Sequence, residues 1–175
     1  MSRYLLRWGV DEIIGDNLVE VDEVRTWGLN GEVVTRVDSK RVKRICGFPH
    51  YIARRDHFHA GLTESARRHG VDIIVGARVN SLEYSPDSVT VTTTKAGSYS
   101  FNLLVGADGI RSFVRQQLFP EVTPLAPSKV AAYRGVLTRE EILTKTPEAK
   151  SVLTNTMDMW TGVQSFVAAD QDYFR

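Results

Sequence analysis

Residues 103–112, Leu-Leu-Val-Gly-Ala-Asp-Gly-Ile-Arg-Ser, join an apolar run to a polar one through two glycines. The apolar run is typical of the end of a buried strand, and Gly106 and Gly109 permit a tight turn after it. Ser112 is a good N-cap for a helix at about 113–118. The stretch therefore predicts a strand, a turn and a helix, which is the repeating element of an α/β fold.

Asp108 stands at the carboxyl end of that predicted strand. In open α/β sheets, ligands bind outside the carboxyl ends of strands. The Asp108 carboxylate can accept backbone N–H bonds from the turn or a hydroxyl of a ligand, and Arg111 can reach a phosphate. The alternative interpretation is a capped strand–helix turn in which Asp108 has a structural role only.

The residues before this stretch predict a mixed set of strands. Val71-Asp72-Ile73-Ile74-Val75 is typical of a buried parallel strand. Residues 78–84 and 88–94 predict an antiparallel hairpin, because Ser85-Pro86-Asp87 between them are turn residues. Residues 99–105 predict a further strand that ends buried.

Residues 55–69 predict a helix, with Phe58, Leu62 and Ala66 on one narrow stripe. Gly70 is suited to cap its C-terminus. Arg54 and Arg55 at its N-terminus oppose the helix dipole, so this end suits an anion such as a pyrophosphate. The alternative is two surface arginines.

The rest of the chain carries weaker patterns. A helix end is expected at 1–9, a strand at 19–27 with a return strand at 33–37, strands at 129–138 and 162–168, and a helix or a loop at 140–149.

Composition excludes several classes of protein. The chain has 175 residues, the size of one ordinary domain, and a net charge of +1, which gives no chain-wide case for nucleic acid. Cys46 is the one cysteine, so internal disulfides and multi-cysteine zinc sites are excluded. No apolar run approaches the ~20 residues of a membrane helix. We expect a cytoplasmic protein of unknown oligomeric state.

The charge is unevenly distributed along the chain. Residues 36–69 carry nine basic and three acidic residues and all four histidines. This block favours either an anionic partner or a solvated face. His57 and His59 lie two apart, which is not the spacing of a helical zinc site, and no metal is expected. Residues 40–44 lack the interleaved aromatic residues of an RNA-binding patch.

Three blocks of sequence, in order, carry a family resemblance. Residues 55–62 are similar to an arginine-led helix of the form R-x-x-L-h-x-x-L, and residues 76–79 resemble a short link between strands. Residues 106–115 closely resemble the fingerprint G-A-D-G-x-x-S-x-V-R. Residues 133–135 look like the segment that enters a substrate domain. With these blocks, residues 1–135 resemble the class A FAD-dependent monooxygenases, the group of p-hydroxybenzoate hydroxylase and salicylate hydroxylase.

The resemblance implies an α/β fold in two parts. Residues 1–126 would form an incomplete Rossmann-like FAD/NAD(P)-binding domain with an antiparallel β-meander, and residues 127–175 the start of a β-rich substrate domain. It implies FAD as cofactor, NAD(P)H as reductant, and hydroxylation of an aromatic or other activated small molecule through a flavin hydroperoxide. Because the flavin carries the chemistry, no catalytic side chain is assigned. The cofactor-binding residues that the resemblance implies are Arg55, Val79, Gly106, Asp108, Gly109 and Arg111.

The sequence lacks several of the family's cofactor-binding motifs. It contains no G-x-G-x-x-G, no acidic residue placed for the ribose, and no G-D-A-A-H-type motif. We therefore expect an internal fragment that is a weak or inactive flavoenzyme alone. The alternatives are a non-catalytic remnant or interaction module of the same family, and a related FAD-dependent reductase or halogenase.

Overall fold

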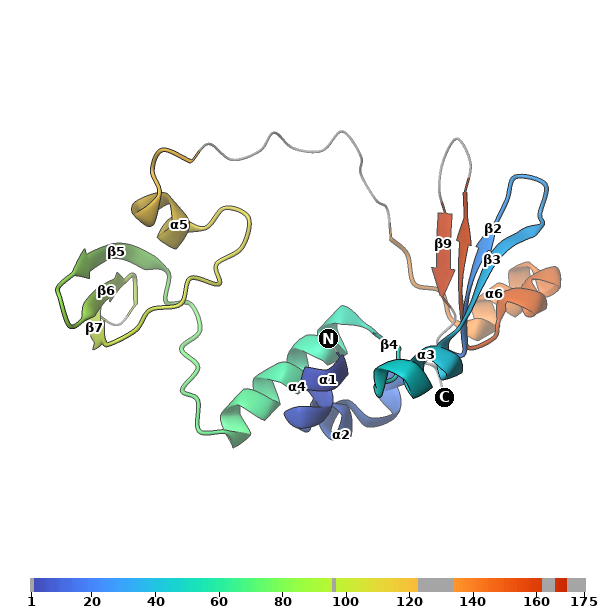
Figure 1. The fold of residues 1–175 in the computed structure, drawn as a ribbon, viewed down its shortest axis with the longest axis horizontal. Helices are drawn as coiled ribbons and strands as arrows, with labels where there is room; N and C mark the ends of the chain where they lie inside the picture. The colour runs from blue at the N-terminus through green and yellow to red at the C-terminus, as the bar shows by residue number, and fades with distance from the viewer. Residues whose placement is uncertain (1, 96, 123–133, 162–165, 170–175) are drawn as a thin grey trace. The chain divides into compact units, whose positions relative to one another are not determined.

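A computed structural model of the chain describes residues 2–95, 97–122, 134–161 and 166–169 (Figure 1). The chain divides into two compact units. Unit 1 consists of Met1–Val71 and Arg134–Arg175, and unit 2 consists of Asp72–Tyr133. The expected functional boundary between residues 126 and 127 is a different kind of division and stays a prediction.

The helical part of unit 1 contains α1 (Ser2–Arg7), α2 (Val10–Ile14), the 3-10 turn η1 (Gly15–Asn17) and α4 (Arg55–Arg68). Helix α2 packs against both α1 and α4. A small core of buried Leu5, Val10 and Ile14 joins the three helices, and Leu18, Phe58 and Leu62 pack against it. The helix predicted at 55–69 is therefore confirmed, and its apolar stripe faces this core.

Gly61 sets how closely α2 and α4 approach. A Cβ atom added at Gly61 would lie 2.5 Å from Ile14 Cγ1 and 3.2 Å from Val10 Cγ1. Nearby, the buried Ser65 hydroxyl donates to the backbone carbonyl of Trp8 at 2.8 Å. Small residues on α4 thus permit a close helix contact and add a hydrogen bond to it.

The main sheet of unit 1 has the order β3-β2-β8-β9. Strands β2 (Glu23–Trp27) and β3 (Val33–Asp38) form an antiparallel hairpin, and β8 (Thr156–Trp160) pairs parallel to β2. Strand β9 (Phe166–Ala169) pairs antiparallel to β8. The sheet therefore joins residues more than 130 positions apart in the sequence.

A second pair of strands, β1 (Leu18–Glu20) and β4 (Tyr51–Ala53), is antiparallel. The prediction of one continuous strand at 19–27 is therefore wrong, because β1 and β2 are two separate strands there. The chain breaks at Val21 and Asp22, whose backbone N–H groups donate to His50 O and Asn155 O instead of continuing one ladder.

The described residues of unit 1 also form the short helices α3 (Ser39–Cys46) and α6 (Arg139–Lys145) and the 3-10 helix η2 (Pro147–Val152). Helix α3 is capped by the Asp38 side chain, and α6 by a capping box between Thr138 and Glu141. Lys40 and Lys43 of α3 pair with Asp22 and Glu20 at 2.9 Å.

Unit 2 contains the predicted antiparallel meander, with the order β5-β6-β7. Its strands are β5 (Val79–Tyr84), β6 (Val89–Thr93) and β7 (Gly97–Phe101), and helix α5 (Phe113–Leu118) follows. Val91, at the centre of the meander, is buried. The expected hairpin and the helix at 113–118 are confirmed, and so is the α/β class.

Several strand predictions are wrong. Residues 71–75 and 103–105 form no strand, and most of their apolar side chains are exposed. Within the described residues no neighbouring strand pairs with them, so the apolar pattern alone does not produce a ladder. Residues 134–138 are not a strand either, whereas 129–133 lie outside the described residues. The strand expected at 162–168 is described as β9 from Phe166 onward.

Candidate functional site

The turn after residue 105 is fixed by Asp108. Its Oδ1 accepts from the Ser112 hydroxyl at 2.5 Å, and its Oδ2 accepts from the backbone N–H groups of Phe113 at 2.6 Å and Val114 at 3.1 Å. Ser112 is itself the N-cap of α5, since its hydroxyl accepts from the Arg115 N–H at 2.9 Å. The predicted N-cap is therefore confirmed, and Asp108 uses both carboxylate oxygens to hold the helix end.

These hydrogen bonds also set the charge of the turn. Donation by Ser112, Val114 and Phe113 holds the pKa of Asp108 below its ordinary value, although desolvation opposes this. Asp108 is exposed to solvent and so stays an anion at neutral pH. The carboxylate keeps lone pairs for one further donor, such as a hydroxyl of a ligand.

Gly106 permits the close approach of the turn to α5. An added Cβ would lie 2.9 Å from both Cβ and Cγ1 of Val114, a distance that real Cβ atoms do not show. Gly109 has a φ of 81°, the left-handed region that side chains disfavour. The turn therefore needs glycine at both positions, for two different reasons.

Arg111 and Arg115 differ in what they contact. Arg115 Nη2 donates to the carbonyl of Ile110 at 2.5 Å and so ties α5 back to the turn. Arg111 is exposed, and its guanidinium makes no ion pair or side-chain hydrogen bond with any residue that the structure describes. Arg111 is thus the residue of this turn with donors left for an anion.

Val79 is the first residue of β5 and pairs with Thr93 of β6. The register shifts between Val79 and Ser81, so a bulge lies at this end of the strand. Arg78, just before it, accepts from the backbone N–H of Thr94 at 2.8 Å, and its own N–H donates to the Thr94 hydroxyl at 3.1 Å. The backbone around Val79 is therefore held in place, and β5 also contacts α5.

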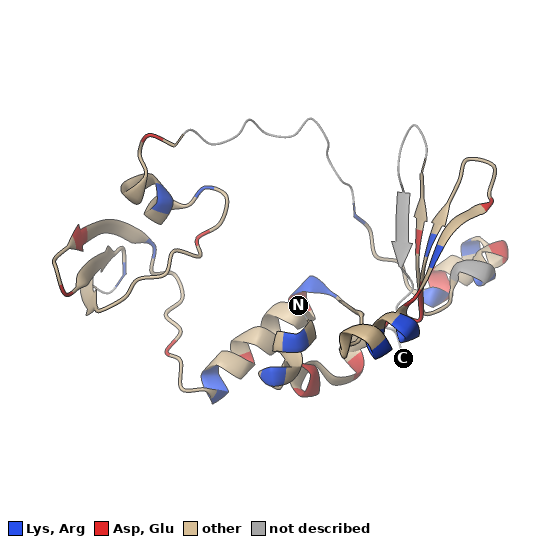
Figure 2. Ribbon diagram, viewed as in Figure 1, with Lys and Arg blue, Asp and Glu red and all other residues tan. Residues whose placement is uncertain are grey.

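Arg55 lies in unit 1, at the first residue of α4. It is exposed and has no charged partner among the described side chains, whereas Arg54 pairs with Asp56 at 2.8 Å. The Arg54 pair helps to lower the pKa of Asp56 against desolvation. Figure 2 shows Lys and Arg at both ends of α4 and along α3. The basic block of the sequence is thus largely a solvated face, with Arg55 unpaired in it.

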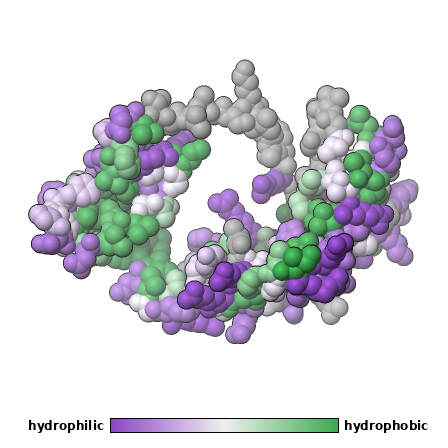
Figure 3. Space-filling model, viewed as in Figure 1, coloured by the Kyte–Doolittle hydropathy of each residue, from purple (hydrophilic) through white to green (hydrophobic). Residues whose placement is uncertain are grey.

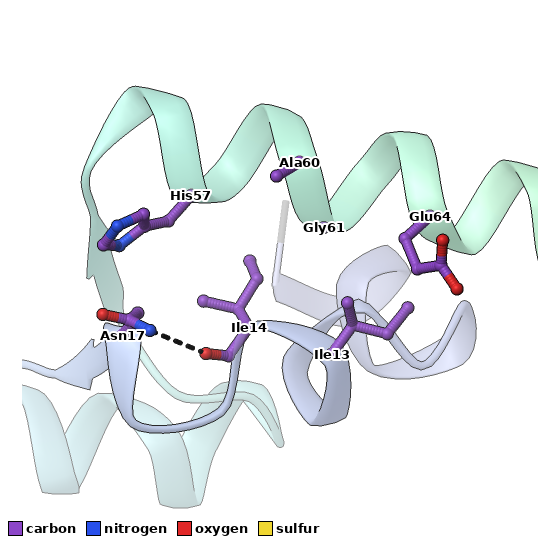
Figure 4. Close-up of a pocket in the computed structure, with 7 residues that line it drawn as sticks. All are labelled: Ile13, Ile14, Asn17, His57, Ala60, Gly61 and Glu64. Carbon is purple, nitrogen blue, oxygen red and sulfur yellow. Dashed lines mark hydrogen bonds between the residues drawn. The ribbon is translucent and has the colours of Figure 1, made fainter.

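A small pocket lies between α2 and α4, with a cavity volume of about 240 Å³ (Figure 4). In the close-up, Ile13 and Ile14 point from α2 toward α4, and His57 and Glu64 stand at opposite ends. The full lining is Ile13, Ile14, Asn17, His57, Ala60, Gly61 and Glu64. The pocket is mainly apolar and holds none of the six residues expected to bind a cofactor.

Within the described ranges, no three His, Cys, Asp or Glu side chains come together as a metal site would require. Cys46 is exposed and unpaired with another cysteine. Among the helices of the described residues, none is both long and apolar enough to cross a membrane.

Comparison with known proteins finds relatives that the chain matches over part of their length. It is 31% identical over 121 residues to the 3-hydroxybenzoate 6-hydroxylase of Klebsiella oxytoca, which covers 66% of this chain and 30% of that protein. It is 28% identical over 173 residues to the FAD-dependent monooxygenase OpS4 of Beauveria bassiana, covering 96% of this chain and 40% of that protein. The chain is similar to the class A FAD-dependent monooxygenases.

The fold agrees with this family. The crystal structure of Klebsiella pneumoniae HpxO complexed with FAD and uric acid matches 92% of this chain with a TM-score of 0.61 and 21% sequence identity. The comparison covers 39% of that protein, and the relatives above are matched over 30% and 40% of their lengths. No family model matches the chain. The chain thus shares the fold of a segment of these monooxygenases.

Proposed function

We propose that this chain supplies part of the FAD-binding site of an NAD(P)H-using monooxygenase that hydroxylates an aromatic or other activated small molecule. The observation that carries the proposal is the turn at residues 106–112, where Asp108 and Ser112 cap α5 and leave the Arg111 guanidinium exposed. The relatives named above are an aromatic hydroxylase and an FAD-dependent monooxygenase. Bound FAD supplies the redox chemistry in such proteins.

The proposed contacts follow from the donors that remain. The guanidinium groups of Arg55 and Arg111 have no charged partner among the described residues, and planar guanidinium groups suit phosphate oxygens. Gly106 and Gly109 carry no side chain, so a cofactor can approach the backbone of the turn at these two positions. Asp108 holds this backbone, and Val79 offers its own backbone near the adenine.

The same residues fit only part of FAD. The sequence has no G-x-G-x-x-G loop for the pyrophosphate. A charge-assisted hydrogen bond contributes about 1.5–3 kcal/mol, so three or four missing contacts remove roughly 5–12 kcal/mol. At about 1.4 kcal/mol per tenfold in affinity, this chain alone should bind FAD weakly.

The test is a titration of the purified chain with FAD, followed by the visible absorbance spectrum and flavin fluorescence. We expect a weak but saturable change that Arg111→Ala and Arg55→Ala each reduce by about tenfold in affinity, or about 1.4 kcal/mol. Arg67→Ala is the matched control, because Arg67 is exposed on the same helix as Arg55 but at its far end. If the chain leaves the absorbance spectrum and fluorescence of FAD unchanged at every concentration, the result would favour the non-catalytic module.

The class of reaction needs a second measurement. With FAD bound, oxidation of NADH or NADPH and a hydroxylated product would support a monooxygenase. Reduction without oxygen incorporation, or halide incorporation, would assign the related reductase or halogenase instead.

A further inference from the structure

The turn that joins β2 to β3 contains the one Asn-Gly pair of the sequence, Asn30–Gly31. Both residues are exposed, and Gly31 has a φ of 77°. The Gly28 N–H donates to the Glu32 carbonyl at 2.9 Å, and the Gly31 N–H donates to the Gly28 carbonyl at 3.1 Å. These bonds close a short hairpin loop whose last residue is in the left-handed conformation. Figure 3 shows hydrophilic and hydrophobic residues together at the surface of this hairpin tip.

The Asn30 side-chain amide is held by no other group of the turn. Within the part of the chain that the structure describes, Asn30 donates only through its backbone N–H, to Glu32 Oε2 at 3.1 Å. Gly31 has no side chain to shield its backbone nitrogen. The single hydrogen bond of that nitrogen lies in an exposed turn, where local opening costs little free energy. The side-chain carbon Cγ of Asn30 is therefore accessible both to the Gly31 nitrogen and to water.

We propose that Asn30–Gly31 is a site of spontaneous deamidation, with water as the co-reactant. The Gly31 nitrogen loses its proton to a base in solution and attacks Cγ of Asn30. The new C–N bond closes a succinimide ring, the bond from Cγ to the side-chain nitrogen breaks, and this nitrogen takes up a proton and leaves as ammonia. Water then opens the ring at either carbonyl carbon, which leaves aspartate or isoaspartate at position 30. No oxidant or reductant takes part.

The pair Asp108–Gly109 shows that a following glycine does not decide reactivity alone. Gly109 has a φ of 81°, close to that of Gly31. The Asp108 carboxylate, however, accepts three hydrogen bonds from the start of α5. These bonds, that from Ser112 first, hold the pKa of Asp108 below its ordinary value, and a carboxylate anion is a poor target for a nitrogen nucleophile. The structure therefore favours reaction at Asn30 over ring closure at Asp108.

The products change both the charge and the backbone of the hairpin. A carboxylate at position 30 is added beside Glu32, whose own carboxylate accepts from the N–H of residue 30. Isoaspartate also inserts a methylene group into the main chain between Gly28 and Glu32, whose hydrogen bond closes the loop. Strand β3 lies at the edge of its sheet, whereas β2 is also paired with β8. The modification should therefore loosen β3 more than β2.

The test incubates the intact chain in mildly alkaline and in neutral buffer and maps its tryptic peptides by mass spectrometry. We expect the peptide of residues 26–36 to gain the mass difference between a hydroxyl and an amino group, at a rate that rises with the hydroxide concentration. Electron-transfer fragmentation should identify isoaspartate at position 30. An unchanged mass of this peptide, or isoaspartate that forms at Asp108 at least as fast, would overturn the proposal.

Asn80 is the matched control within the same sample, because it is exposed too but lies in β5 and precedes Ser81. Its peptide should keep its mass, and equal rates at Asn30 and Asn80 would contradict a role for the glycine and the turn. Asn30→Gln keeps a side-chain amide but moves its carbon one bond further from the Gly31 nitrogen. This variant should lose the mass shift, and a shift that persisted would place the reaction at another residue.

Amide hydrogen exchange tests the effect on the hairpin. In the modified chain the amides of β3 should exchange faster than in the unmodified chain, and those of β2 should change less. Unchanged exchange throughout β3 would contradict the structural consequence of the modification.

Discussion

Asp158 and Arg25 lie directly opposite each other in the parallel strands β8 and β2, joined by two hydrogen bonds of 2.6 Å. Trp27 Nε1 and the Thr156 hydroxyl donate to the same carboxylate, at 2.5 and 2.8 Å. Asp158 is 1% exposed, yet each of its oxygens has at least two donors. The carboxylate is therefore buried and fully paired, which is the condition under which a buried charge is tolerated.

This pair also fixes the register of the parallel strands. Side chains alternate between the two faces of a strand, so a slip by one residue would move Asp158 to the face of Met157 and Met159. There it would lose the donors that β2 supplies, Arg25 and Trp27. The pair thus selects one alignment of β2 and β8 over its neighbours.

The first prediction is that Asp158→Asn destabilises unit 1 by about 3 kcal/mol, the cost of breaking a buried pair from one side. The amide has one oxygen where the carboxylate has two, and its NH₂ group faces the donors of Arg25 and Trp27. Urea unfolding followed by tryptophan fluorescence measures the change, because Trp27 and Trp160 stack over this region at 6.1 Å between ring centroids.

Asp16→Asn is the control for that measurement, since Asp16 is exposed in η1. It should change the free energy of unfolding by less than about 0.5 kcal/mol. Equal losses for both substitutions would contradict a special role for Asp158.

A second prediction concerns how acid pH changes the stability that Asp158 contributes. Burial would raise the pKa of Asp158, but the hydrogen bonds from Arg25, Trp27 and Thr156 outweigh burial and hold this pKa below its ordinary value. An unfolded aspartate has a pKa of about 3.9, so the stabilisation is complete above that value and is lost as pH falls through the lower folded pKa. The stability gap between the wild type and Asp158→Asn should therefore narrow as pH falls below about 4.

Denaturant unfolding of both proteins at a series of pH values tests this. Asp56, Asp108 and Glu141 also have lowered pKa values, but they are present in both proteins and cancel in the difference. A gap that stays constant down to acid pH would show that the Asp158 carboxylate gains nothing from its partners.

How much of the fold and of the candidate site the sequence predicts depends on how far apart in the chain the interacting residues lie. The capping of α5 by Ser112 and the turn at Asp108 involve residues within six positions of each other, and the sequence predicts both. The Arg25–Asp158 pair joins residues 133 positions apart, and no local pattern marks either one. At residues 71–75 the sequence instead predicts a strand that the structure does not have. A pattern typical of a buried strand does not reveal whether a partner strand is present.

The residues expected to bind the cofactor show the same difference between local and long-range interactions. The glycines at 106 and 109 are predicted by local turn chemistry and have clear geometric reasons. Val79 is predicted from the family resemblance alone, and Arg55 from that resemblance together with its place at the start of the predicted helix; both roles remain predictions. Local hydrogen bonds explain the shape of the turn, whereas contacts to a ligand depend on residues that sequence spacing does not bring together.

A third prediction tests the contact between α2 and α4. Gly61→Ala should destabilise unit 1 by about 1–3 kcal/mol, because the new Cβ would lie 2.5 Å from Ile14 Cγ1. On an uncrowded helix the same change would stabilise by up to about 1 kcal/mol, so the sign itself is informative. The double variant Gly61→Ala with Ile14→Ala should lose less stability than the sum of the two single variants, since the added methyl group fills space that the Ile14 side chain no longer occupies. Strictly additive effects of the two substitutions would contradict direct contact.

The last prediction separates the two ways in which the turn at residues 106–115 is held. Ser112→Ala removes the N-cap of α5 and should cost about 1 kcal/mol of stability in unit 2. Gly106→Ala should cost more, because its Cβ would lie 2.9 Å from Val114 Cβ, an atom that rotation of the Val114 side chain cannot move away. Val114→Ala should relieve the Gly106→Ala defect but not the Ser112→Ala defect, since Val114 contributes to the clash and not to the cap. Amide exchange of the α5 residues measures the stability of the two single variants, Ser112→Ala and Gly106→Ala, and of each of them combined with Val114→Ala. If Val114→Ala improved both defects equally, the cap and the close approach would not be independent, and the turn would have to be treated as one cooperative contact.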